Sequence, residues 1–159
     1  MIDTPRSSLV RPQATAAEDA LALTIAKEMF KREGTGPAFD IQIIDVGVGY
    51  AKLSMVLQDM MLNGHGTAHG GMIFTLADTA FAYACNARNV TTVAQHASIS
   101  FLSPGKAGEK LTAEAIEEHQ AGRSGIYHIT VYGEDDRKVA IFQGLSRSIG
   151  GAVIAEDKR

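Results

Sequence analysis

The stretch from Gly70 to Asn86 constrains the fold more than any other part of this chain. Its apolar side chains point in every direction around a 3.6-residue repeat, and a helix that is apolar all round is a buried one. A single charge, Asp78, interrupts it. A carboxylate in apolar surroundings finds hydrogen-bond donors, has a raised pKa, or borders a ligand cavity. The stretch therefore predicts a buried central helix that carries a candidate functional acid.

The residues before this helix predict an exposed loop. Residues 63–69 are polar and rich in glycine, so their backbone can approach a ligand closely. Gly70 and Gly71 fall at the expected helix start, where free N–H groups and the positive end of the helix dipole favour a developing negative charge. The alternative is a tight turn from loop to helix with no further role.

Composition bounds the remaining choices. The 159 residues are 45% hydrophobic and carry a formal net charge of -3, which suits one domain with a real core. No basic run points to nucleic acid, and no segment is apolar for long enough to span a membrane. The single cysteine, Cys85, excludes an internal disulfide and fits a reducing compartment. We expect a cytoplasmic protein with a flexible N-terminal segment at 1–14 and a single domain at 15–159.

Periodicity predicts the elements around the central helix. Thr15 and Glu18 have the spacing of a capping box, so a first helix should follow and stop at Gly34, with Gly36 and Pro37 forming a link. Alternation at period two predicts six strands, at 39–43, 51–57, 93–101, 111–118, 125–132 and 139–149. The first two should form a hairpin and the last four an antiparallel meander. The predicted class is α+β, a six-stranded antiparallel sheet wrapped around the long central helix, with an extra N-terminal helix.

Two patterns argue against familiar chemistries. His65 and His69 have the H-x-x-x-H spacing that binds a metal on a helix, but Gly64 and Gly66 disfavour a helix there and no third ligand stands nearby. No G-x-S-x-G elbow is present, which disfavours a serine hydrolase. We therefore expect no metal site and no cofactor.

Several candidate residues keep two interpretations at this point. Asp78 is either a structural carboxylate bonded to Thr79 or the backbone, or a general base or nucleophile in an apolar pocket. Arg123, Arg147 and Lys106 are either solvated surface charges or cations that hold the phosphates of a large ligand.

Four motifs carry a resemblance to a known family. They are Asn63-Gly64-His65, His69-Gly70-Gly71, Leu76-Ala77-Asp78-Thr79-Ala80 and Phe101-Leu102-Ser103-Pro104-Gly105. Together they resemble the PaaI-type (phenylacetate-degradation) acyl-CoA thioesterases of the hotdog superfamily, over nearly all of residues 30–149. The resemblance implies the hotdog fold, no cofactor, and hydrolysis of an aromatic, phenylacetyl-type acyl-CoA to free acid and coenzyme A.

The resemblance also implies roles for individual residues. Asp78 matches the helical carboxylate that acts as general base or nucleophile, and Gly70 matches the residue whose N–H polarises the thioester carbonyl. His69 and Asn63 match residues that position the thioester and the attacking water, and Thr79 matches the hydroxyl neighbour of the carboxylate. The family arrangement further implies a dimer of dimers that takes coenzyme A at a subunit boundary.

Helix geometry predicts that each site is shared between two chains. A helix rises 1.5 Å per residue, so Gly70 and Asp78 lie about 12 Å apart along one axis and cannot both reach one thioester. A two-fold axis resolves this, and we expect a homodimer in which the two residues of a site come from different chains.

Two alternative functions remain open from the sequence. One is a non-catalytic acyl-CoA binding or sensing protein, since fold does not fix function. The other is a hotdog hydratase, although the D-x-N-P-x-H type loop of that branch is absent here.

Overall fold

The computed structural model describes residues 9–158. Of the segment 1–14, expected to be flexible, residues 1–8 therefore lie outside the described residues. Within the rest of that segment, Arg11 forms ion pairs with Asp19 at 2.9 Å and Asp45 at 2.8 Å, and its guanidinium lies 4.5 Å from the centroid of the Tyr50 ring. The domain boundary at residue 14 stays a prediction.

Helix α1 (Ala16–Arg32) begins at the predicted capping box. The Glu18 N–H donates to Thr15 Oγ1 at 3.2 Å, and the Thr15 N–H donates to the Glu18 carboxylate at 2.8 Å. These two bonds satisfy backbone donors that a helix start leaves free. The predicted first helix and its N-terminal cap are confirmed.

The expected glycine stop of α1 is wrong in detail. Glu33 leaves the helix in an extended conformation, and Gly34, with a right-handed backbone, caps the short helix α2 (Thr35–Ala38). Gly36 and Pro37, expected to form a link, lie inside α2. Proline is tolerated in a first helical turn because its missing N–H would have no partner there.

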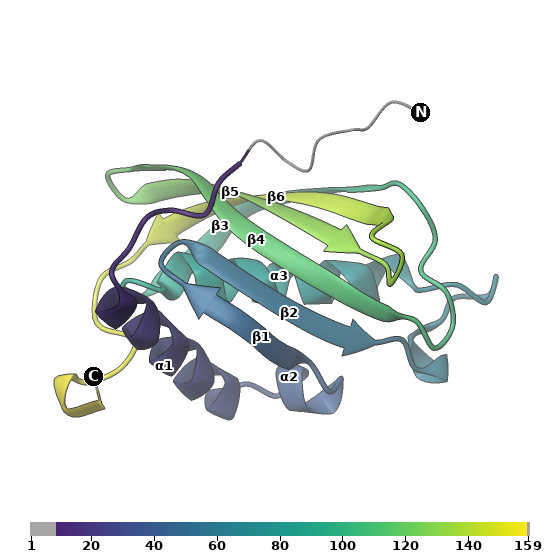
Figure 1. Ribbon diagram of the computed structural model, residues 1–159, viewed down its shortest axis with the longest axis horizontal. Coiled ribbons are helices and arrows are strands. Elements are labelled where there is room, and N and C mark those ends of the chain that lie inside the picture. Colours follow the sequence, from purple (N-terminus) through teal and green to yellow (C-terminus); the bar gives the residue numbers. More distant parts are fainter. Residues whose placement is uncertain (1–8, 159) are drawn as a thin grey trace.

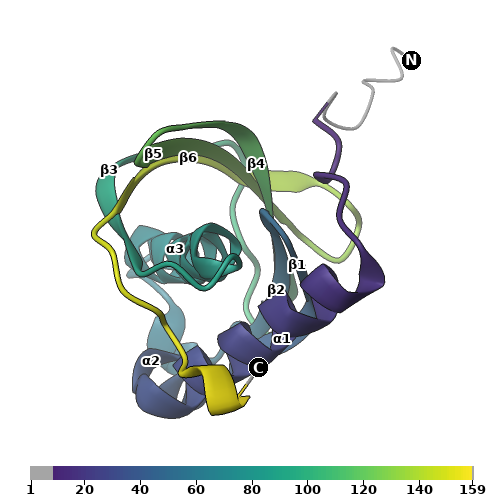
Figure 2. The same ribbon diagram turned by 90° about the vertical axis from the view of Figure 1, so that its left-hand side faces the viewer.

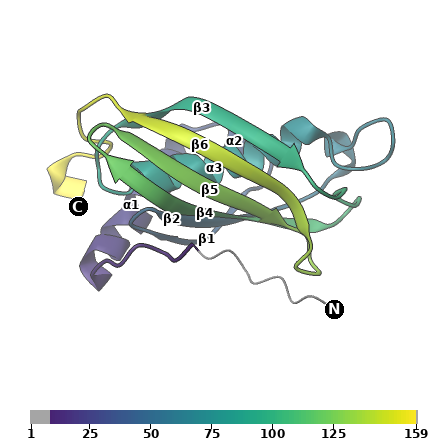
Figure 3. The same ribbon diagram turned by 90° about the horizontal axis from the view of Figure 1, so that it is seen from above.

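Six strands form one antiparallel sheet in the order β1-β2-β4-β5-β6-β3 (Figure 3). The strands are β1 (Gln42–Gly47), β2 (Tyr50–Val56), β3 (Thr92–Phe101), β4 (Lys110–Ala121), β5 (Ser124–Tyr132) and β6 (Lys138–Ser148). The predicted antiparallel sheet and the β1–β2 hairpin are confirmed. The first strand, expected at 39–43, is shifted toward the C-terminus, because Asp40 has a left-handed φ of 49° that breaks the extended chain.

The predicted four-strand meander is wrong for β3. Strands β4, β5 and β6 do follow one another, but β3 pairs with β6, with Phe101 opposite Ala140 and Val93 opposite Arg147. Residues 102–109, the crossover segment, therefore lead from one edge of the sheet to β4 and do not form a hairpin turn. The edges are β1, which has α1 beside it (Figure 2), and β3.

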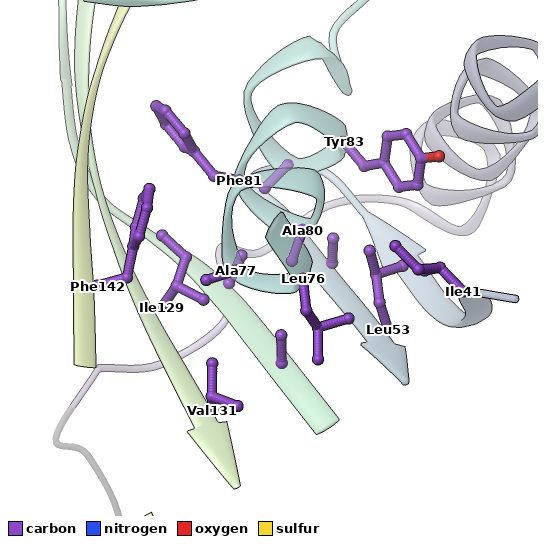
Figure 4. Close-up of a cluster of buried hydrophobic side chains, with 14 of the residues drawn as sticks. Ile41, Leu53, Leu76, Ala77, Ala80, Phe81, Tyr83, Ile129, Val131 and Phe142 are labelled. Carbon is purple, nitrogen blue, oxygen red and sulfur yellow. The ribbon is translucent and has the colours of Figure 1, made fainter. Parts of the chain in front are cut away.

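Helix α3 (Gly70–Asn86) is the predicted central helix, and the sheet curls around it (Figure 2). Its buried side chains meet those of the strands in one core (Figure 4). Members of this core are Ile41, Leu53, Leu76, Ala77, Ala80, Phe81, Tyr83, Ile129, Val131 and Phe142. The Tyr83 hydroxyl also donates a hydrogen bond to Glu33, which ties α3 to the end of α1. No helix within residues 9–158 has the length and apolarity needed to cross a membrane.

Candidate active site

Asp78 lies on the side of α3 that the sheet does not cover. It shares a stripe of one helix face with Gly71, Thr75 and Ala82, and none of the four is fully buried. Burial nevertheless raises the pKa of the Asp78 carboxyl above its ordinary value. Within residues 9–158, no hydrogen bond or ion pair to this carboxylate is present.

The structural interpretation of Asp78 is not supported. The Thr79 hydroxyl, which could have held the carboxylate, donates instead to the backbone carbonyl of Thr75 at 2.7 Å. The Thr79 side chain is buried, away from the stripe that carries Asp78. A half-buried carboxylate with no donor costs free energy in the folded chain, which is typical of a functional group.

His69 caps the start of α3. Its Nδ1 accepts a hydrogen bond from the Gly71 N–H at 2.9 Å. An accepting Nδ1 is unprotonated, so the neutral ring carries its proton on Nε2. The exposed ring can therefore offer an Nε2–H donor to a bound molecule at the helix start.

The neighbouring Gly70 N–H is the second donor at this point. Gly70 is the first residue of α3, so its N–H has no acceptor within the helix. No other group within residues 9–158 accepts a hydrogen bond from this N–H. A Cβ built at Gly70 would lie 3.0 Å from the Phe101 ring, which is 53% exposed at the end of β3. The absence of a side chain at Gly70 thus leaves a bare N–H beside an accessible aromatic ring.

Asn63 organises the loop that leads to this helix start. Its Oδ1 accepts hydrogen bonds from the N–H groups of His65 at 2.9 Å and Thr67 at 3.3 Å, and its Nδ2 donates to Thr67 Oγ1 at 3.1 Å. The loop is closed further by a backbone bond from the His69 N–H to the Met61 carbonyl at 2.8 Å. The Asn63 side chain therefore stabilises the conformation of the loop.

The structure brings together only part of the predicted site. Asn63, His69 and Gly70 meet at the junction of loop and helix, whereas Asp78 lies about two turns further along α3. No three His, Cys, Asp or Glu side chains within residues 9–158 are grouped so that they could hold a metal ion.

The three predicted phosphate-binding cations fall at two places. Lys106 lies beside the loop, because it forms a backbone bridge with Thr67. Arg147 pairs with Val93 at the start of β3, and Arg123 donates to the Ser148 carbonyl near the same place. The two arginines therefore lie at the end of β3 opposite to Phe101 and Gly70 of their own chain.

Sequence reasoning missed three residues around this site. Phe101 was part of a motif but had no assigned role, and Glu109 and Arg137 were not singled out at all. Arg137 and Glu109 form an ion pair at 2.9 Å beside the crossover segment. Charged residues 28 positions apart give no local signal of such a pair.

Comparison with known proteins identifies relatives of this chain. Residues 65–140 match the family described as the thioesterase superfamily. The chain is similar to the acyl-coenzyme A thioesterase PaaI of Escherichia coli, with 43% identity over 82% of this chain and 94% of that protein. The structure of the E. coli PaaI protein from the phenylacetic acid degradation operon has a TM-score of 0.83 and 42% identity, covering 84% of this chain and 97% of that one. A Streptococcus mutans protein bound to acetyl CoA has a TM-score of 0.68 and 25% identity, covering 70% of this chain and 90% of that one.

Proposed function

This chain belongs to the PaaI-type acyl-coenzyme A thioesterases of the thioesterase superfamily, and on that premise we propose how its residues hydrolyse a thioester. The predicted family, the hotdog fold and the thioester hydrolase class are confirmed by the relatives. The observation that carries the proposed mechanism is that α3 presents two groups, the Asp78 carboxylate and the Gly70 N–H, for which residues 9–158 provide no hydrogen-bond partner.

In the proposed reaction Asp78 is the general base. It takes a proton from water, the water oxygen bonds to the thioester carbon, and the carbonyl oxygen becomes an oxyanion. The Gly70 N–H of a second copy of the chain stabilises this oxyanion, because the Asp78 and Gly70 of one helix lie about 12 Å apart. The carbon–sulfur bond then breaks, and the coenzyme A thiolate leaves and takes up the proton. The raised pKa of Asp78 suits this role, because a base works best when its pKa is near the working pH. His69 Nε2–H is a second donor for the substrate carbonyl, Asn63 shapes the loop, and Thr79 anchors the helix next to Asp78.

We propose that the acyl group is aromatic, of the phenylacetyl type. The half-exposed Phe101 ring beside Gly70 offers an aromatic face where the acyl group would lie. The E. coli relative, from a phenylacetic acid degradation operon, supports the same choice. A cytoplasmic location is part of this proposal, since Cys85 is a free thiol.

The experiment that tests this function is a thiol-release assay over a panel of acyl-CoAs. We expect turnover with a preference for phenylacetyl-CoA over acetyl-CoA and long-chain acyl-CoAs. Asp78→Asn should abolish most of the rate, whereas the matched control Asp40→Asn should not, because asparagine tolerates the left-handed backbone at that turn. Wild-type activity in Asp78→Asn would assign the base elsewhere.

We further propose that the active unit is a homodimer, doubled to a dimer of dimers. Support comes from β3, an open edge of ten residues with Val93 and Phe101 exposed at 44% and 53%, because long open edges favour strand pairing. Antiparallel pairing of two β3 edges would bring the Arg123 and Arg147 end of one chain toward Phe101 of the other. Those arginines and Lys106 would then be able to contact the phosphates of coenzyme A.

A further inference from the structure

A partly buried ion pair lies at the end of the molecule where α3 begins. The side chains of Arg137 and Glu109 are 21% and 6% exposed. Arg137 Nη2 lies 2.9 and 3.1 Å from the two carboxylate oxygens of Glu109. Neither residue takes part in the proposed proton transfer or in binding the oxyanion.

The pair holds the crossover segment from both of its ends. Arg137 Nη2 also donates to the Pro104 carbonyl at 2.9 Å. The Glu109 carboxylate accepts the N–H of Lys106 at 2.8 Å and that of Glu134 at 3.2 Å. Although burial alone would raise the pKa of Glu109, these hydrogen bonds and the Arg137 charge lower it below its ordinary value. Glu109 therefore stays ionised, and the pair stays formed, at neutral pH.

The crossover segment in turn supports the loop in front of α3. The Ala68 N–H donates to the Gly105 carbonyl at 2.9 Å, and Thr67 and Lys106 form a backbone bridge. A Cβ built at Gly105 would lie 2.9 Å from the Ala68 Cβ, so the crossover segment and the loop are closely packed at this point. Figure 1 shows the loop, the crossover segment and the β5–β6 turn gathered at its right-hand end. A shift of the crossover segment would therefore move Ala68, which is two residues before Gly70, or break this hydrogen bond.

We propose that Arg137 and Glu109 are positioning residues for thioester hydrolysis, which hold the Gly70 N–H where the carbonyl oxygen needs it. They act through the crossover segment and the hydrogen bond from Ala68 to Gly105, and they do not touch the substrate. This inference rests on the proposed function, because it assigns the pair a part in that same reaction. A misplacement of about 1 Å at a reacting group costs about 100-fold in rate, so such a support affects the chemical step.

The test compares Arg137→Gln and Arg137→Lys with the matched control Arg88→Gln. Arg88 makes a similar two-bond pair, at 2.5 and 2.9 Å, with Glu117, whose side chain is 10% exposed, but it follows the C-terminal end of α3. At a temperature where each variant is fully folded, Arg137→Gln should lower kcat by about 10- to 100-fold and leave KM within about threefold. Arg137→Lys should regain part of the rate, because lysine keeps the charge and loses the fork. Arg88→Gln should lower the melting temperature without lowering kcat.

Amide hydrogen exchange gives a second measurement that does not depend on turnover. Arg137→Gln should speed exchange of the Ala68 amide, and Arg88→Gln should leave it unchanged. Wild-type kcat in folded Arg137→Gln, an equal loss in Arg88→Gln, or unchanged exchange at Ala68 would each overturn the positioning role. If the wild-type protein hydrolysed no thioester, the proposed function would be wrong. The exchange rate of the Ala68 amide in Arg137→Gln would still show whether the ion pair holds the loop, because this measurement needs no turnover.

Discussion

Replacing Gly70 by proline removes one N–H from the proposed site and puts the carbons of the proline ring in its place. Gly70 is the first residue of α3, a position where proline is favoured because its fixed φ suits the helix and the lost N–H has no helical partner. The preceding His69 has φ -62° and ψ 132°, which is the extended conformation that a following proline requires. We therefore expect Gly70→Pro to fold with a stability close to that of the wild type.

The size of the expected catalytic effect follows from the donor that is lost. Removing one preorganised oxyanion donor costs about 2.7–4 kcal/mol, or about 100- to 1,000-fold in kcat. The new Cβ meets the Phe101 ring at 3.0 Å, so the ring must move by a few tenths of an ångström. The matched control is Gly70→Ala, which adds the same Cβ and keeps the N–H. The difference between the two variants therefore leaves out the contact of the Cβ with Phe101, and it reports the loss of the N–H together with the ring carbons that proline puts in its place.

The assay is thiol release from phenylacetyl-CoA at saturating and limiting substrate, with circular dichroism to verify folding. We expect Gly70→Ala to keep most of kcat and Gly70→Pro to lose at least about 100-fold relative to it. Equal kcat values in two folded variants would refute the role of the Gly70 N–H. In that case another donor, such as His69 Nε2–H, would have to bind the oxyanion.

Further measurements test the base, the shared site, the coenzyme A contacts and the core. Because burial raises the pKa of Asp78, the folded chain holds this proton more tightly than the unfolded chain, so the charged carboxylate lowers stability above its ordinary pKa. Asp78→Asn should therefore raise the melting temperature at pH 7, and the gain should vanish at about pH 3, below the ordinary carboxyl pKa. Randomly mixed Asp78→Asn and Gly70→Pro chains should regain roughly a quarter of wild-type activity, since half of the dimers are hybrids with one intact site of two; no recovery would refute the shared site. Arg147→Gln should raise KM for phenylacetyl-CoA but not for the phosphate-free N-acetylcysteamine thioester, and equal KM changes would contradict a phosphate contact. Gly144→Ala should cost about 1–3 kcal/mol of unfolding free energy, because its Cβ would lie 2.6 Å from the Phe81 ring; Gly64→Ala, with nothing within 4 Å, is the control.

Elements that depend on residues close together in the sequence could be predicted from the sequence. The capping box of Thr15 and Glu18 is a contact between residues three positions apart, and it forms as expected. The bounds of α3 follow from an apolar stretch between a glycine-rich loop and Asn86. The first strand was misplaced because alternation at 39–43 begins inside a turn, where the left-handed Asp40 prevents an extended chain.

Features that depend on contacts between residues far apart in the sequence could not be predicted in the same way. Ser103, Pro104 and Gly105 mark a turn, and such residues suit a hairpin and a crossover equally well. The pairing of β3 with β6 depends on contacts between residues far apart in the sequence, such as Phe101 with Ala140 and Val93 with Arg147. Arg137 and Glu109 escaped notice for the same reason, because each alone has the pattern of a surface charge.

The unsatisfied groups of α3 are the strongest link between sequence and assembly. Asp78 has a partly buried carboxylate to which no group within residues 9–158 donates, and the Gly70 N–H has no acceptor among those residues. Both groups belong to one helix, and its geometry keeps them about 12 Å apart. A single thioester cannot contact both groups within one chain, whereas a thioester between two chains related by a two-fold axis can contact one group from each. The carboxylate that stands out in the sequence therefore predicts a chemical step and, together with the helix start, the symmetry of the molecule that performs it.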